Sequence, residues 1–284
     1  MASDCDALLG QEQSAAALAN LARESEGNRN CIVEANGIPP LLALLDSSNP
    51  KSKENSVNRR ATHCISGSLP AALALPPSFA ATDLHARQHF RHTPPLPLQV
   101  VAITELCRKS KINQVAFSGA GGIPKLVSVL LGFQAAGAKE ASYINLCTLA
   151  AEAIKEMAKD NPSNQQEIAE AGAIPPLVAA LGASFAHLQA NAAGALANLA
   201  RSHMENQGLI ARTGAVAPLC TLVRDGSEET KDRCASAIWS LATDHAINKD
   251  TIAKLGGIDP LLGLLLTGTT ERSQVTQHCH PIGV

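Results

Sequence analysis

Apolar residues recur along most of the chain at spacings of three and four, the periodicity of helices that bury one face. Residues 227–242 show the pattern in its longest form. Ser227 can cap such a helix, and Glu228 and Glu229 follow in the first turn, where carboxylates interact favourably with the helix dipole. One face of this helix then carries Cys234, Ala237, Ile238 and Leu241. The pattern predicts a long amphipathic helix here.

Shorter periodic segments precede the long ones. Residues 164–169 and 206–211 each begin with Asn-Gln and predict a short first helix. Residues 177–181 carry the apolar stripe of a second helix. A unit of short, medium and long helices cannot bury its apolar surface alone, so we expect successive units to stack on one another.

One phrase, Gly-Ala-Ile-Pro-Pro-Leu at 172–177, recurs in variant form. Its β-branched anchor lies at positions 38, 123, 174, 216 and 258, which gives intervals of 85, 51, 42 and 42. The underlying period is therefore 42 residues, within the range typical of solenoids. Small residues before the anchor can close one helix, and Pro after it can open the next. Each phrase predicts a sharp corner between two helices.

A period of about 42 residues, a Gly-x-Ile-Pro-x-Leu corner and a Leu-Ala-Asn-Leu-Ala third helix at 196–200 resemble the armadillo repeat family. Residues 11–57 and 101–270 fit this pattern. Within this family, the sequence pattern most resembles that of vacuolar armadillo adaptors and of the armadillo regions of plant U-box proteins. The resemblance implies an all-α, armadillo-type right-handed α-solenoid of three-helix repeats. HEAT repeats, the structural alternative, lack the Gly-Ile-Pro corner.

The interval of 85 residues divides the chain. We expect an N-terminal repeat portion at 1–57, a distinct segment at 58–100, further repeats at 101–270 and a truncated repeat or tail at 271–284. The solenoid would then be uncapped at both ends. Six prolines and four of the nine histidines lie in 58–100, and prolines at this density prevent a long helix.

Two interpretations of residues 58–100 remain open: a disordered insertion, which includes a retained non-coding stretch of the gene, and a decayed repeat. Val57 and Val100 occupy equivalent positions relative to their nearest corners. Removal of the segment would therefore leave one continuous third helix. The interval of 51 carries nine extra residues around 132–141, which predict a loop or a third helix that starts near Lys139.

Composition narrows the class of partner. A net charge of −2 and a pI near 6.5 give no basic field for nucleic acid. The eight cysteines form no CxxC pair, and most are expected to be buried thiols in a reducing compartment. No apolar run is long enough to span a bilayer, so we expect no membrane insertion. The expected location is the cytoplasm, with the nucleus as the alternative.

Candidate chemistry is sparse. His85, His89 and His92 could face one side of a helix as metal ligands, but their Pro-rich context favours a solvated segment and no metal site. Asp244 and His245 are expected to solvate the end of a third helix. No phosphate-binding loop, nucleophile elbow or zinc-protease motif occurs in the sequence. We therefore expect a non-enzymatic protein without a cofactor.

The family resemblance implies a groove lined by the third helices, where Trp and an Asn four residues later form ladders that hold an extended peptide. At those positions this chain has Ala16 with Asn20, Val101 with Glu105, Glu152 with Glu156, Gly194 with Asn198, and Trp239 with Thr243. The ladder is mostly absent. A surface role for the two Asn residues and a core role for Trp239 are the alternatives.

The expected groove residues are Asn20, Glu105, Glu152, Glu156, Asn198, Trp239 and Thr243. Carboxylates at 105, 152 and 156 favour a basic or mixed-charge extended partner. The sequence thus predicts a non-catalytic scaffold that binds an extended protein segment. The alternative is the substrate-binding portion of a ubiquitin ligase, and the sparse ladder disfavours a nuclear import adaptor.

Overall fold

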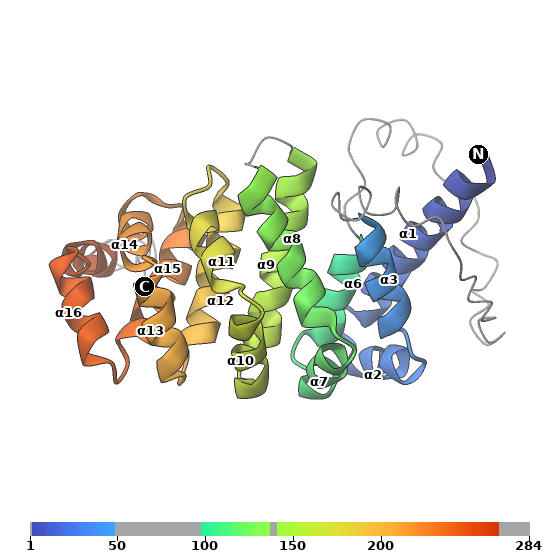
Figure 1. The fold of residues 1–284 in the computed structure, drawn as a ribbon, viewed down its shortest axis with the longest axis horizontal. Coiled ribbons are helices and arrows are strands. Elements are labelled where there is room, and N and C mark those ends of the chain that lie inside the picture. The colour runs from blue at the N-terminus through green and yellow to red at the C-terminus, as the bar shows by residue number, and fades with distance from the viewer. Residues whose placement is uncertain (1, 49–97, 137–140, 267–284) are drawn as a thin grey trace, which may run out of the picture.

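The computed structural model describes residues 2–48, 98–136 and 141–266, and each regular element within these ranges is an α-helix. The helices follow one another in groups of three along an elongated stack, with α1 at one end and α16 at the other (Figure 1). The predicted all-α solenoid of three-helix repeats is therefore confirmed.

Each repeat has a short first helix, a second helix and a third helix. The first helices are α2 (Glu26–Glu34), α7 (Lys111–Gly119), α10 (Pro162–Glu170), α13 (Met204–Arg212) and α16 (Ala246–Lys254). The second helices are α3 (Ile38–Ser48), α8 (Gly122–Ala136), α11 (Ile174–Leu181) and α14 (Val216–Asp225), and residues 258–266 are also helical. The third helices are α1 (Ala2–Ala22), α6 (Leu98–Cys107), α9 (Ala141–Ala158), α12 (Ala186–Ala200) and α15 (Glu228–Ala242).

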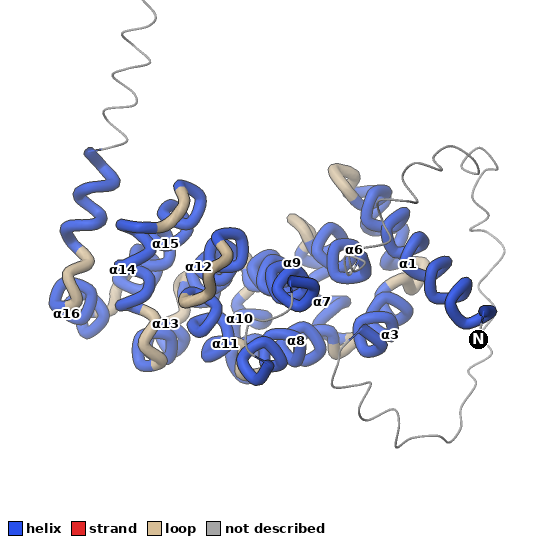
Figure 2. The backbone as a smooth tube through the Cα atoms, turned by 90° about the horizontal axis from the view of Figure 1, so that it is seen from above, coloured by secondary structure: helices blue, strands red, loops and turns tan. Residues whose placement is uncertain are grey.

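The third helices lie side by side and form one wall of the solenoid. Helix α12 packs between α9 and α15, and α6 packs between α1 and α9. Viewed from above, α6, α9, α12 and α15 follow one side of the stack, and α3, α8 and α11 follow the other (Figure 2). Small side chains such as Ala193 and Ala195 are fully buried in α12, because closely packed helices leave room for little else.

The turn from each third helix to the next first helix has a constant design. One residue adopts a left-handed conformation, as Asp160 does with φ of 51°, and the following residue caps the new helix. The capping residues are Ser25, Ser110, Asn161, His203 and His245, whose side chains accept a backbone N–H three residues on. His245 thus starts α16 rather than solvating the end of α15, which corrects the sequence interpretation.

The turn from the first to the second helix is the predicted Gly-Pro corner. Gly172 has φ of 83°, a conformation that glycine adopts without steric cost, and Pro175 follows in the first turn of α11. Asn36 holds the equivalent position before α3 with φ of 59°. The sequence prediction of a sharp corner is confirmed here.

Asn and Gln side chains of the first helices tie the repeats together. Asn164 Nδ2 donates to the Met157 carbonyl at 3.1 Å, across the turn from the third helix of the preceding repeat. Gln165 Nε2 donates to the Ala158 carbonyl at 3.1 Å and to the Asn198 carbonyl of the next third helix at 2.9 Å. These bonds satisfy carbonyl groups that the ends of third helices would otherwise leave without a partner.

The 51-residue and 85-residue intervals between corner phrases correspond to different features of the structure. The nine extra residues lengthen α8 to 15 residues and α9 to 18, beside 8 and 15 in α11 and α12. Helix α6 begins at Leu98, so residues 98–100 of the predicted 58–100 segment belong to this helix. Residues 58–97, including the three histidines considered as metal ligands, lie outside the described residues.

Within the ranges that the structure covers, no single helix is long and apolar enough to cross a membrane. The bent pair of α7 and the start of α8, Lys111–Gly119 with Gly122–Gly132, meets the criteria by length and composition only. Both helices bury apolar side chains in the core of the stack, among them Phe117 and Ile123.

Candidate functional site

The third helices α9, α12 and α15 border a hollow of about 540 Å³, together with Arg108 just after α6 and the residues after α9 and α12. Its lining is predominantly polar and charged. The predicted residues Glu152, Glu156 and Asn198 lie in this hollow, so we name it the third-helix groove.

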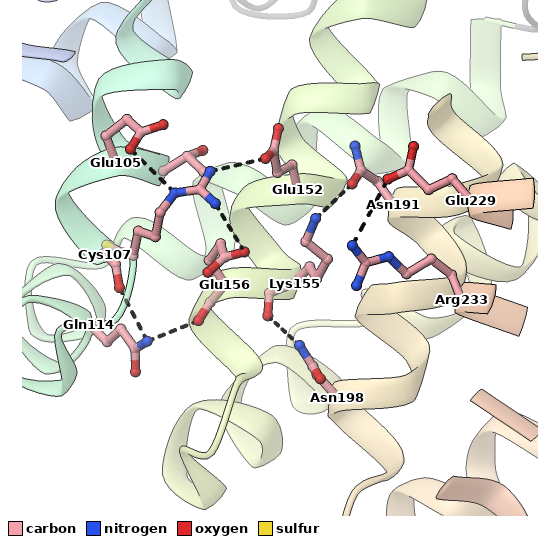
Figure 3. A network of polar contacts seen from close by, with 12 residues as sticks. Glu105, Cys107, Gln114, Glu152, Lys155, Glu156, Asn191, Asn198, Glu229 and Arg233 are labelled. Carbon is pink, nitrogen blue, oxygen red and sulfur yellow. Dashed lines mark hydrogen bonds and ion pairs between the residues drawn. The ribbon is translucent and has the colours of Figure 1, made fainter. Parts of the chain in front are cut away.

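The three predicted carboxylates lie together at the α6–α9 end of the groove (Figure 3). Arg108 sits among them: its Nη2 donates to Glu152 Oε1 at 3.2 Å, and its Nε lies 3.3 Å from Glu105 Oε2. Its Nη1 lies 3.7 Å from Glu156 Oε1. The expected acidic patch is therefore already paired with a cation of the chain itself, which the sequence interpretation left out.

The surroundings of Arg108 stabilise its charge. Burial acts to lower the pKa of the guanidinium, but the charges of Glu156 and Glu105 and the hydrogen bond to Glu152 raise it above its ordinary value. The side chains of Glu105 and Glu156 are each only 11% exposed. Each of these two carboxylates thus has little access to water and faces the same guanidinium.

The middle of the groove contains a second set of polar contacts. Lys155 Nζ donates to Asn191 Oδ1 at 2.9 Å, and Arg233 Nη2 lies 3.9 Å from Glu229 Oε1. Burial lowers the pKa of Lys155, the charges of Glu152 and Glu156 oppose this shift, and the smaller effect of Arg233 adds to it. Lys155 and Arg233 point toward each other across α12 (Figure 3).

Gly194 of α12 lies beneath these two cations. A Cβ atom at this position would lie 2.9 Å from Lys155 Cδ and 3.5 Å from Arg233 Cδ. The aliphatic stems of Lys155 and Arg233 therefore cover the position where the family ladder would place an aromatic ring. Sequence reasoning missed both residues, although Lys155 stands three positions after Glu152 and one before Glu156, on the same helix.

The hydrogen bonds fix which residues are equivalent in successive third helices. Gln165 Nε2 donates to the Asn198 carbonyl, and Gln207 Nε2 donates to the Ser240 carbonyl, in both cases at 2.9 Å. Ser240, rather than Thr243, is therefore the counterpart of Asn198. The predicted pair of Trp239 and Thr243 is wrong by three residues, because the 42-residue offset between α12 and α15 was not applied there.

The remaining predicted residues have the following places. Trp239 is 62% exposed, which excludes the core role considered for it. Asn20 is exposed on α1, and Asn198 Nδ2 donates to the Lys155 carbonyl at 2.8 Å. Thr243 caps the end of α15 and its Oγ1 donates to the Trp239 carbonyl at 2.8 Å. Among the covered residues, no group of His, Cys, Asp and Glu could hold a metal ion.

Three-helix units in a linear stack, with a polar groove along the third helices, define an α-solenoid repeat protein. The armadillo/beta-catenin-like repeat family matches residues 25–58 and 161–201. The second match begins at Asn161, the N-cap of α10, and ends just after α12, so it spans one complete unit of the stack. Two segments of the chain thus match the armadillo repeat model, and the chain has the fold of an armadillo-type solenoid.

Solved structures of designed armadillo repeat proteins share the fold. One is 22% identical, with a TM-score of 0.66, and the alignment covers 89% of this chain and 84% of that one. Another, solved in complex with a (KR)4 peptide, is 22% identical with a TM-score of 0.64 and 90% of each chain covered. No curated protein sequence shows a significant match.

Proposed function

We propose that this protein is a non-catalytic interaction scaffold, which binds an extended segment of a partner protein along the third-helix groove. The observation that carries the proposal is the groove itself: adjacent third helices present charged and amide side chains into one elongated hollow. An extended segment exposes backbone N–H and C=O groups that such side chains can hydrogen-bond.

The solved relatives support this choice of partner. One designed armadillo repeat protein was crystallised with a (KR)4 peptide, and a further one was designed for modular peptide recognition. The latter is 22% identical, with a TM-score of 0.64 and 90% of each chain covered. Since these proteins share the fold of this chain, a peptide or protein segment is the partner class that we propose.

The charges of the groove support a mixed-charge partner over a uniformly basic one. Glu105, Glu152 and Glu156 are paired with Arg108, so a basic side chain would have to displace an internal guanidinium to reach them. Farther along the groove, Lys155 and Arg233 would repel a basic segment.

The sparse ladder supports a function other than nuclear import. The ladder positions in α9, α12 and α15 hold Glu152, Gly194 and Ser236, so these three helices provide no stacked indoles for Lys or Arg stems. The substrate-binding portion of a ubiquitin ligase is the alternative proposal, since the same groove would hold the substrate.

A photo-crosslinking experiment tests the groove. We would replace Ser236, on α15 in the groove, by a photoreactive phenylalanine analogue and irradiate the protein with a library of random extended peptides. The matched control carries the analogue at Met204, an exposed residue at the start of α13. We expect peptides to crosslink at position 236 and not at 204. Equal labelling at both positions, or none at 236, would contradict the proposed function.

A further inference from the structure

Cationic side chains outnumber anionic ones in the groove beyond the α6–α9 end. Lys155, Lys159, Arg201 and Arg233 line this section, whereas Glu229 supplies the carboxylate on α15. We name this part of the third-helix groove, bordered by α9, α12 and α15, the basic section.

Two of the cations in the basic section have weak or neutral partners. Lys155 Nζ is hydrogen-bonded to an uncharged amide oxygen, that of Asn191, at 2.9 Å. Arg233 lies 3.9 Å from Glu229, and that carboxylate is also 3.9 Å from His187 Nδ1. A contact of 3.9 Å is too long for a hydrogen bond. The positive charges therefore keep donor capacity for a group that is not part of the described chain.

Arg201, just after the end of α12, is a third cation with a weak partner. It lies 3.8 Å from Asp160 Oδ1, and its Nε is buried without a hydrogen-bond partner. A buried N–H group without a partner costs free energy that an incoming acceptor can recover. This third cation extends the basic section along the axis of α12.

The geometry at Gly194 creates a place for an anion. Because this residue has no side chain, the stems of Lys155 and Arg233 approach its Cα from neighbouring helices. The two stems approach the same point of α12, with Lys155 Cδ 2.9 Å and Arg233 Cδ 3.5 Å from the position of a Cβ atom, so the two charged groups lie near each other. An anion between them would relieve their repulsion and gain from both charges.

The α6–α9 end of the groove provides an internal comparison. There Arg108 has a carboxylate within 4 Å of each of its three nitrogen atoms, so its charge is matched by the chain itself even though its Nε, like that of Arg201, makes no hydrogen bond. In the basic section the matching carboxylates are fewer and more distant. The groove is therefore electrostatically polarised along its length.

We propose that the partner segment carries acidic side chains, and that one of its carboxylates binds between Lys155 and Arg233 above Gly194. This inference rests on the proposed function, because it assigns a chemistry to the segment that lies in the groove. The polarity also orients the partner, with its acidic residues over α12 and α15 and its neutral or basic residues toward α6.

The experiment measures binding of labelled synthetic peptides by fluorescence anisotropy. The probe alternates Glu and Ser, and two matched peptides carry Gln or Lys in place of each Glu. We expect the Glu peptide to bind at least about fivefold more tightly than the Gln peptide, with a preference that weakens as salt rises. The Lys peptide should bind least tightly.

The variant is the double substitution Lys155→Met with Arg233→Gln, which removes both charges and retains most of the two stems. Its control is Lys249→Met with Lys254→Met, two exposed residues on α16, so the change in net charge is the same. The first variant should lose at least about fivefold in affinity for the Glu peptide, and the control should stay within about twofold. Circular dichroism verifies that both variants keep their helices.

Two results would overturn the inference. Equal affinity for the Glu and Gln peptides would show that the groove does not select carboxylates, and an unchanged affinity in the double variant would place the acidic site elsewhere. If library peptides still crosslink at position 236, the scaffold function stands and only the acidic preference fails. If they do not, both proposals fail.

Discussion

The side-chain amide of Gln165 joins its own repeat to the preceding one, and its bond within the repeat goes to the backbone carbonyl of Asn198 at 2.9 Å. The same amide nitrogen donates to the Ala158 carbonyl at 3.1 Å. Gln114 makes the equivalent pair of bonds to Cys107 and Glu156 one repeat earlier. One glutamine thus bridges the ends of two third helices, and the groove residue Asn198 is positioned by it.

Gln165→Ala is expected to destabilise the protein by roughly 1–3 kcal/mol, because it leaves two carbonyl groups without a donor. The neighbouring Gln166 is the matched control: it is exposed, and its amide reaches Glu170 on the surface. Gln166→Ala should change the free energy of unfolding by less than about 0.5 kcal/mol. Urea unfolding followed by circular dichroism measures both. Equal effects would refute the bridging role.

Arg108→Met should destabilise the fold by roughly 1–3 kcal/mol, since it removes the guanidinium that lies among Glu105, Glu152 and Glu156. Addition of Glu156→Gln to this variant should recover part of the loss, because one repulsive charge is removed. A double-mutant cycle from chemical denaturation measures the coupling. Additive effects of the two substitutions would mean that Arg108 and Glu156 do not interact.

The pattern of the sequence predicted the fold because each repeat carries the same local signals. The Gly-Ile-Pro corner before α11 and the cap Ser227 before α15 both lie where the sequence placed them. The groove was predicted less well. Arg108 contacts carboxylates from two different helices, and Glu152, to which it donates a hydrogen bond, is 44 residues away in the sequence. Periodicity alone does not reveal such a pairing.

Buried thiols predict a dependence of stability on alkaline pH. Burial raises the pKa of Cys147 and of Cys234 to about 12. In the unfolded chain a thiol loses its proton near pH 8.5, so above this pH the folded state holds more protons than the unfolded state. The free energy of unfolding should therefore fall as pH rises from about 9 to 12, by up to about 1.4 kcal/mol per unit for each thiol.

Urea titrations at a series of pH values between about 8 and 10.5 measure this slope. Cys234→Ala should reduce it, whereas Cys31→Ala should not, because Cys31 is exposed. A slope that the Cys234 substitution leaves unchanged would contradict the prediction.

Ala195→Leu should overpack the contact of α12 with its neighbours and cost roughly 1–3 kcal/mol. Ala195 is fully buried in the core cluster. Ala179 on α11 is exposed, so Ala179→Leu is the control and should change the melting temperature little. An unchanged melting temperature for Ala195→Leu would show that the interface tolerates a larger side chain.

Deletion of residues 58–100 should raise the melting temperature and make unfolding more cooperative. Helix α6 has 10 residues where α12 and α15 each have 15, yet it packs between α1 and α9 as a third helix does. The deletion would join residue 57 to Val101, which restores a 42-residue interval between the two corners and should extend this helix toward its N-terminus. Thermal unfolding of the full chain and the deletion provides the comparison. A lower melting temperature for the deletion would favour a true repeat in this segment.

The amide hydrogen bonds between repeats also fix the spacing between successive repeats. Asn206 Nδ2 donates to the Gln165 carbonyl and Asn248 Nδ2 to the Gln207 carbonyl, both at 3.2 Å, so the first helices are linked in series as the third helices are. With both edges of each repeat fastened to the next, the step from one third helix to the next has little freedom to stretch. The distance between equivalent groove positions in successive repeats is therefore nearly fixed. A partner segment must match this distance in the spacing of its own side chains.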